Sequence, residues 1–199
     1  MHPDQFDLKK GRVVEIDLNT LLVALMFVTI LSMGIGNILL GLADIFNHAT
    51  PTRRDRTHVA WIVLMLVVHF NMFWHTKAIL GVDDWQFGGF LLAMAGPVLM
   101  FFATSIMLTD PPAGEGEDLR RFFDALGLRF YLMFAALQAW IIFVSYSLMG
   151  QFVPSDLVNL AFLVLSLLLA AKPRDPYQRP GIFLAWGLGL GSLVLRWFS

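Results

Sequence analysis

The sequence predicts an all-α bundle of about six transmembrane helices, and three observations lead to this fold class. First, 57% of the 199 residues are hydrophobic and only 15% are charged, whereas soluble domains are typically ~45–50% apolar and ~25% charged. Second, several apolar windows exceed the ~18 residues that mark a membrane-spanning helix. Third, only short loops separate these windows, which predicts one transmembrane domain over 18–199 after a polar tail over 1–17.

The composition also restricts the partners that the chain can take. Its net charge is −1, so no overall field attracts nucleic acid, and the lipid bilayer is the first partner expected. The absence of Cys removes disulfides, thiolate metal sites, iron–sulfur clusters and cysteine nucleophiles. The tail over 1–17 is polar and carries charges of both signs, unlike the basic region of a cleaved signal peptide. We therefore expect the first span to be retained.

The first three spans are predicted over 18–42, 57–80 and 85–109. In the first, Asn37 is a polar side chain inside the span, and one portion is small-sided, which permits close helix packing: Ser32, Gly34, Gly36 and Gly41. The second span carries several polar residues in its second half. In the third, Pro97 falls near the middle and should kink the helix, because proline removes a backbone hydrogen bond.

The last three spans are predicted over 129–149, 154–171 and 181–198. An amphipathic helix should begin near Glu117, which is spaced i, i+4 from Arg121, and should run directly into the fourth span. A Pro-rich connector over 172–180 precedes the sixth span. There Gly187 and Gly191 have the GxxxG spacing that is typical of packed membrane helices.

The distribution of Lys and Arg predicts the orientation of the chain. Six spans place both termini on one side of the membrane, and cytoplasmic loops are enriched in these two residues. Eight Lys and Arg residues fall in the first, third and fifth loops, against five in the tails and the other two loops. The count favours termini outside the cell, with the Arg-bearing loops in the cytoplasm.

His69 is the main candidate for a functional residue within the spans. At ~1.5 Å per residue, it lies roughly 18 Å into a helix that starts at Thr57, near the bilayer midplane. A polar group at this depth is costly and is a functional candidate by default. The alternative is a neutral histidine that donates one hydrogen bond to a neighbouring helix. Gln138, at a similar depth in the fourth span, is the predicted partner of His69.

The other polar residues of the second span form an outer group. His75 is six residues from His69 and points about 120° away, so the two cannot bind one ion from the same helix. Asn71 and His75 are spaced i, i+4 and share a face, which fits an outward-facing cavity. The alternative is that His75 is simply hydrated at the membrane interface. The candidates for the rim of this cavity are Asp83, Asp84 and Lys77.

The sequence contains no recognisable catalytic or metal-binding set. No nucleophile and base can be paired, no cluster has metal-ligand spacing, and the common nucleotide and hydrolase motifs are absent. Haem held by two histidines would need a second histidine on another span, and no other span contains one. The cofactor is therefore left open, and an enzyme is the third choice among the function classes.

One segment carries a resemblance. His69-Phe-Asn-Met-Phe-Trp74 is followed by Trp85-Gln-Phe-Gly-Gly-Phe90, then by Pro97 and Pro111. This pattern resembles a group of small bacterial multi-pass membrane proteins of uncharacterised function. The chain departs from the group at Phe73, where Trp is expected, and at Asn71, where Gln is expected. The resemblance implies a bacterial inner-membrane location and a shared feature at His69, Asn71 and Trp74, and it implies no activity.

Two functions from different classes follow as expectations. In the first, the bundle conducts or transports an ion or a small solute. The path would be lined by His69, Asn71, His75 and Gln138, and the kink at Pro97 would allow gating. In the second, the chain is a non-catalytic accessory or assembly subunit. It would pack through its small-residue faces against other membrane subunits or a second copy of itself.

Overall fold

The computed structural model describes residues 18–47, 56–82, 85–109, 117–149, 152, 154–171 and 175–197. These residues form six α-helices and one 3-10 helix, and none of them forms a strand. The helices are α1 (Leu18–Asn47), α2 (Arg56–Trp74), η1 (His75–Gly81), α3 (Phe87–Met107), α4 (Glu117–Met149), α5 (Pro154–Ala171) and α6 (Asp175–Trp197). The all-α helix bundle predicted from the sequence is confirmed.

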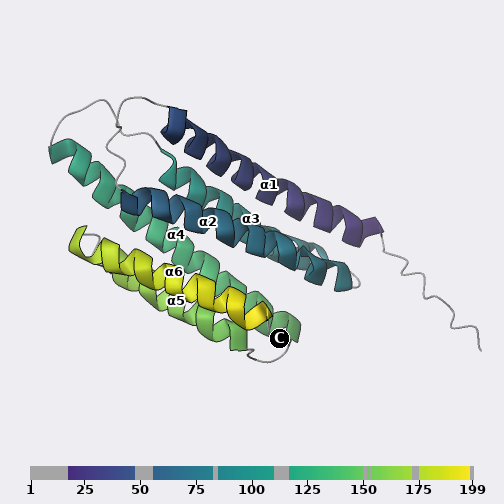
Figure 1. Cartoon of the computed structure of the whole chain (residues 1–199). Coiled ribbons are helices and arrows are strands. Elements are labelled where there is room, and N and C mark those ends of the chain that lie inside the picture. The colour runs from purple at the N-terminus through teal and green to yellow at the C-terminus, as the bar shows by residue number, and fades with distance from the viewer. Residues whose placement is uncertain are drawn as a thin grey trace, which may run out of the picture.

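The six α-helices are arranged in a closed ring of contacts. Around the ring, α1 contacts α3, α3 contacts α4, α4 contacts α5, α5 contacts α6, α6 contacts α2, and α2 returns to α1. In Figure 1, α2 and α6 lie in front of α3, α4 and α5, and α1 lies along the upper edge. The interior of the bundle is therefore the space between the front helices and the helices behind them.

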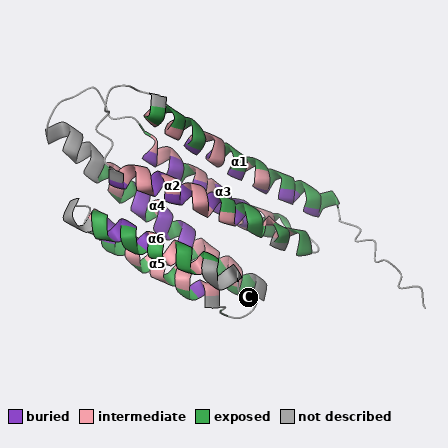
Figure 2. Ribbon diagram, viewed as in Figure 1, coloured by how far each residue is buried: buried purple, intermediate pink, exposed green. Residues whose placement is uncertain are grey.

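The outer surface of the bundle is apolar. Figure 2 shows exposed residues along the outward faces of the helices and buried residues between them. Large apolar side chains such as Leu40, Phe87 and Phe183 are 71%, 74% and 78% exposed. Soluble monomers rarely expose apolar surface on this scale. Within the described residues, four stretches are long and apolar enough to cross a bilayer: Leu18–Phe46, Thr57–Gly81, Phe87–Met107 and Ala125–Ser147. The chain is a membrane protein.

An aromatic cluster joins α2 to α4 across the interior. The ring of Trp61 meets those of Phe130, Tyr131 and Phe134 edge-on, with centroids 5.4, 5.6 and 6.4 Å away. Phe134 in turn contacts Phe162 of α5 at 5.8 Å. Edge-to-face rings are a favourable arrangement, because the positive edge of one ring meets the negative face of the other. The cluster fixes the register of α2 against α4.

The helix boundaries differ from the predicted spans at several ends. The second span is an α-helix only to Trp74 and continues as the 3-10 helix η1, a tighter winding that is common at helix ends. α6 begins at Asp175, within the predicted connector, because Pro176 falls in the first turn, where its missing N–H leaves no bond unmade. The prediction that the amphipathic segment runs directly into the fourth span is confirmed by the unbroken α4.

Candidate functional site

His69 is completely buried, and its ring has a defined orientation. Its Nδ1 lies 2.8 Å from the carbonyl oxygen of Met65, one turn earlier on α2. A carbonyl only accepts, so Nδ1 carries the hydrogen, and in the neutral ring Nε2 is left as an acceptor. Nε2 faces α1 at Gly34, where an added Cβ would lie 2.5 Å from it. Within the described part of the chain, Nε2 has no hydrogen-bond partner.

Gln138 lies at the depth of His69 on the opposite side of the interior. α2 and α4 start at the same end of the bundle, and Trp61 packs against Phe130. His69 and Gln138 each lie eight residues further along their helices, which is ~12 Å. Gln138 is 3% exposed, and its Oε1 has no partner among the described residues. The predicted pairing is therefore not a hydrogen bond in this structure, because neither His69 Nε2 nor Gln138 Oε1 has a partner among the described residues.

Other buried polar side chains near the middle of the bundle bond to their own helices. The hydroxyl of Thr104 donates to the carbonyl oxygen of Met100 at 2.8 Å, and that of Ser166 donates to Phe162 at 2.7 Å. Asn37, one of the polar candidates, is half-buried on α1, one turn after Gly34. His69 and Gln138 differ from Thr104 and Ser166 because each keeps a buried acceptor that its own helix does not satisfy.

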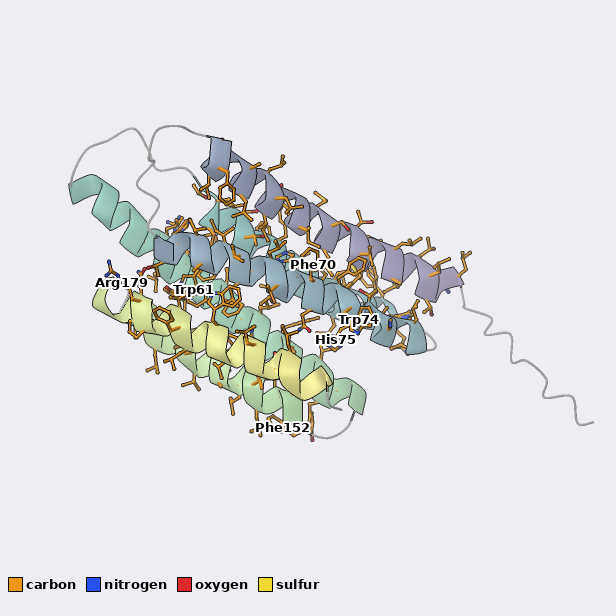
Figure 3. All side chains as sticks on the ribbon, in the orientation of Figure 1. Trp61, Phe70, Trp74, His75, Phe152 and Arg179 are labelled. Atoms are coloured by element: carbon orange, nitrogen blue, oxygen red, sulfur yellow. The ribbon has the colours of Figure 1, made fainter. Side chains whose placement is uncertain are left out.

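The outer group of predicted site residues lies at the end of α2 that is opposite to Trp61. Figure 3 shows Trp74 and His75 at this end and Trp61 toward the other. Asn71 is half-buried and His75 is exposed, so the two do not line a closed interior surface together. The Lys77 amino group lies 3.8 Å above the Trp74 ring, a cation–π contact. The rim candidates Asp83 and Asp84 lie outside the described residues.

The region around Pro97 is closed by a side chain that the sequence analysis did not select. α3 is continuous through Pro97, which is buried together with Gly96. The indole of Trp140 on α4 lies directly on Gly96, and its Nε1 donates to the Leu92 carbonyl oxygen at 2.7 Å. The carbonyl that Pro97 leaves without its helical N–H is that of Ala93, so the bond to Leu92 is an additional link between α4 and α3. The kink itself stays a prediction, and Trp140 covers the place where it is expected.

Only some of the glycines predicted for packing face another side chain closely. A Cβ added to Gly36, Gly187 or Gly191 would meet nothing within 4 Å in the described chain. Gly34 and Gly41 of the small-sided portion of α1 do face large side chains, and so do two glycines that were not predicted, Gly96 and Gly181. The GxxxG pair of α6 faces outward, and the packing role predicted for it is not played within the described chain.

Sequence reasoning also missed Asp156. This carboxylate is 1% exposed in the first turn of α5 and accepts a hydrogen bond from Ser145 Oγ on α4 at 3.2 Å. The available signal was an acidic residue just after Pro154, because a helix N-terminus favours negative charge. The hydrogen bond from Ser145 across the turn between α4 and α5 gives this carboxylate a structural role. Among the described residues, no three His, Asp or Glu side chains gather to hold a metal ion.

The fold and the interior define the class of the protein: a membrane protein built as an α-helical bundle, in which the buried acceptors of His69 and Gln138 have no donor among the described residues. No family model, curated protein or solved structure matches the chain.

Proposed function

We propose that this multi-pass bundle conducts or transports an ion or small solute, with His69 as the midplane group of the path. One observation carries the proposal: Nε2 of His69 and Oε1 of Gln138 lie at the same depth, both buried and both without a donor. An unsatisfied buried acceptor costs about 1–3 kcal/mol. A solute that passes through and donates a hydrogen bond to these acceptors would recover that energy. A role in solute binding therefore explains the two unpaired acceptors, whereas helix packing does not.

The described conformation fits the closed state of such a path. His69 is pressed against Gly34, and the rings of Trp61 and Phe134 fill the space between α2 and α4. Conduction then needs movement of α2 relative to α1 or α4, and the Pro97 region of α3 is the candidate hinge. Asn71 and His75, at the outer end of the same helix run, would form the approach.

The location belongs to the same proposal. The excess of Lys and Arg in the first, third and fifth loops supports an orientation with both termini outside, and the bacterial inner membrane follows from the resemblance over the second and third spans. The even number of α-helices supports termini on one side, and α1 begins at the end of the bundle where α6 ends (Figure 1).

The proposal is tested by flux into proteoliposomes. Protein in vesicles should admit at least one probe from a set of K⁺, protons, urea and glycerol, and His69→Ala and Gln138→Leu should each abolish that flux. Ser166→Ala is the matched control, because this buried hydroxyl is already satisfied by its own helix, and it should conduct normally. Circular dichroism checks that each variant is folded. Equal flux in folded His69→Ala, or none with the native protein, would remove the proposal.

A second candidate function is favoured by the outward glycines. Gly187 and Gly191 lie on the exposed face of α6, flanked by Leu184 and Leu190, which are 60% and 53% exposed. Small residues allow a neighbouring membrane helix to approach closely. We propose as the alternative a non-catalytic accessory or assembly subunit, which packs this face against another membrane subunit or a second copy of the chain.

The alternative predicts a stoichiometric complex. Purification in mild detergent should retain a partner, or a dimer, and Gly187→Leu should release it because the added side chain blocks close approach. Gly89→Leu, at an exposed glycine near the start of α3, is the control and should leave the complex intact. A stable single chain with no partner, from native membranes under the same conditions, would count against this function.

A further inference from the structure

The buried side-chain atoms that lack hydrogen-bond partners are concentrated along α2 and its continuation. In the described chain there are five: Trp61 Nε1, His69 Nε2, Thr76 Oγ1, Trp85 Nε1 and Gln138 Oε1. Three of these belong to α2 and η1, at 61, 69 and 76. Intervals of eight and seven residues are close to two helical turns, so the three side chains share one face. Among the described residues, no other helix carries more than one.

The five atoms fall at three depths. Thr76 and Trp85 flank the turn between η1 and α3 at the outer end. His69 and Gln138 lie at one level near the middle, on opposite sides of the interior, and Trp61 lies about two turns further inward. The hydrogen-bonding character changes with depth. A hydroxyl and an indole N–H stand at the outer level, two acceptors stand at the middle level, and an indole N–H donor stands at the inner level.

Two methionines separate these levels on the same face of α2. Met65 follows Trp61 by four residues, and Met72 follows His69 by three, and the two are 0% and 8% exposed. The face therefore reads Trp61, Met65, His69, Met72, Thr76. Methionine is unbranched, with three rotatable bonds, so its side chain can change position with little strain.

We propose that the solute route follows this face of α2, that Met65 and Met72 are its gates, and that the solute is a small uncharged molecule that both donates and accepts hydrogen bonds. This inference rests on the proposed function. Such a molecule donates to His69 and Gln138 and accepts from Trp85, while the Trp61 indole N–H is shared with the Tyr131 hydroxyl beside it. No ionised side chain lies on the face. A charged solute would meet no opposite charge there. Because an unpaired charge is costly in a membrane interior, the route should exclude charged solutes. The thioethers between levels also interrupt any chain of groups that could relay protons.

The test uses the full-length protein in vesicles and measures urea and glycerol entry by light scattering, with K⁺ and proton entry measured in parallel. Urea or glycerol should enter faster than into empty vesicles, with no added K⁺ or proton conductance. Thr76→Val should slow this entry about fivefold to tenfold, the loss expected when one hydrogen bond is removed. Met72→Ala should speed it, while Met33→Ala, at a methionine 55% exposed on α1, should leave it unchanged.

The outcomes separate this inference from the proposed function. K⁺ or proton flux without urea or glycerol flux would overturn the uncharged-solute inference and leave a conducting protein. No flux of any probe would remove the proposed function as well. If Met72→Ala fails to fold, Met72→Leu preserves the volume with a stiffer side chain, and it should slow urea entry. Unchanged entry in folded Met72→Leu and Thr76→Val would show that the route does not follow α2.

Discussion

Gly96→Ala is expected to lower the stability of the bundle by about 1–3 kcal/mol, the usual cost of adding volume to a packed interior. The added methyl would fall within the Trp140 ring, which lies directly on Gly96. The ring cannot retreat freely, because its Nε1 donates to Leu92 at 2.7 Å. Relief of the clash therefore breaks this hydrogen bond or separates α3 from α4.

Unfolding by SDS titration from mild detergent measures this effect. Gly88→Ala is the matched control on α3, since a Cβ there meets nothing within 4 Å, and its stability should be close to that of the native chain. Trp140→Phe combined with Gly96→Ala should recover part of the loss, because the smaller ring leaves room for the methyl. Equal stability of the two alanine variants would mean that Trp140 does not lie on Gly96.

Gly34→Ala is expected to have the second largest effect, with a loss of about 1–3 kcal/mol for the same reason. The added Cβ would stand 2.5 Å from His69 Nε2, so the imidazole must leave its place against α1. Gly36→Ala, two residues along the same helix, meets nothing within 4 Å and should be nearly neutral. The stability of both is read from the same detergent titration.

A double-mutant cycle makes the Gly34 prediction specific to His69. In Gly34→Ala/His69→Ala, the missing imidazole leaves space for the new methyl, so the second substitution should cost less than it does alone. Contacting residues commonly show interaction energies of ~0.5–3 kcal/mol in such cycles. Strict additivity of the two losses would contradict the contact between His69 and Gly34.

The hydrophobic pattern was sufficient to predict the helix bundle and the approximate position of each helix, because long apolar runs must satisfy their backbone groups internally. It could not predict that α2 ends at Trp74, since an apolar run is compatible with either an α-helix or a 3-10 helix at a helix end. It also predicted the depth of His69 and Gln138, because depth depends only on the rise per residue.

The sequence could not predict the direction in which each side chain points. Helical spacing predicted that His69 and Gln138 lie at one level. It could not predict that the His69 imidazole points its Nδ1 toward the Met65 carbonyl oxygen and its Nε2 toward α1. The helix that a side chain faces depends on how the helices are arranged around the bundle. The order of the helices in the sequence does not reveal that α2 has α1 and α6 as neighbours. The same reason explains the glycines: GxxxG spacing marks Gly187 and Gly191, which face outward, whereas Gly34 faces the His69 ring of α2.

The proposed route depends on the state of His69: a neutral ring with hydrogen on Nδ1 and, within the described chain, an Nε2 without a hydrogen-bond partner. Nitrogen NMR of ¹⁵N-histidine-labelled protein in bilayers tests it directly, with His69→Ala used to assign the signal among the five histidines. The structure predicts a protonated Nδ1 and an unprotonated Nε2 for this residue, unchanged in Ser166→Ala. A signal from the Nε2-protonated ring would contradict the hydrogen bond to Met65 and the free acceptor on which the proposed route depends.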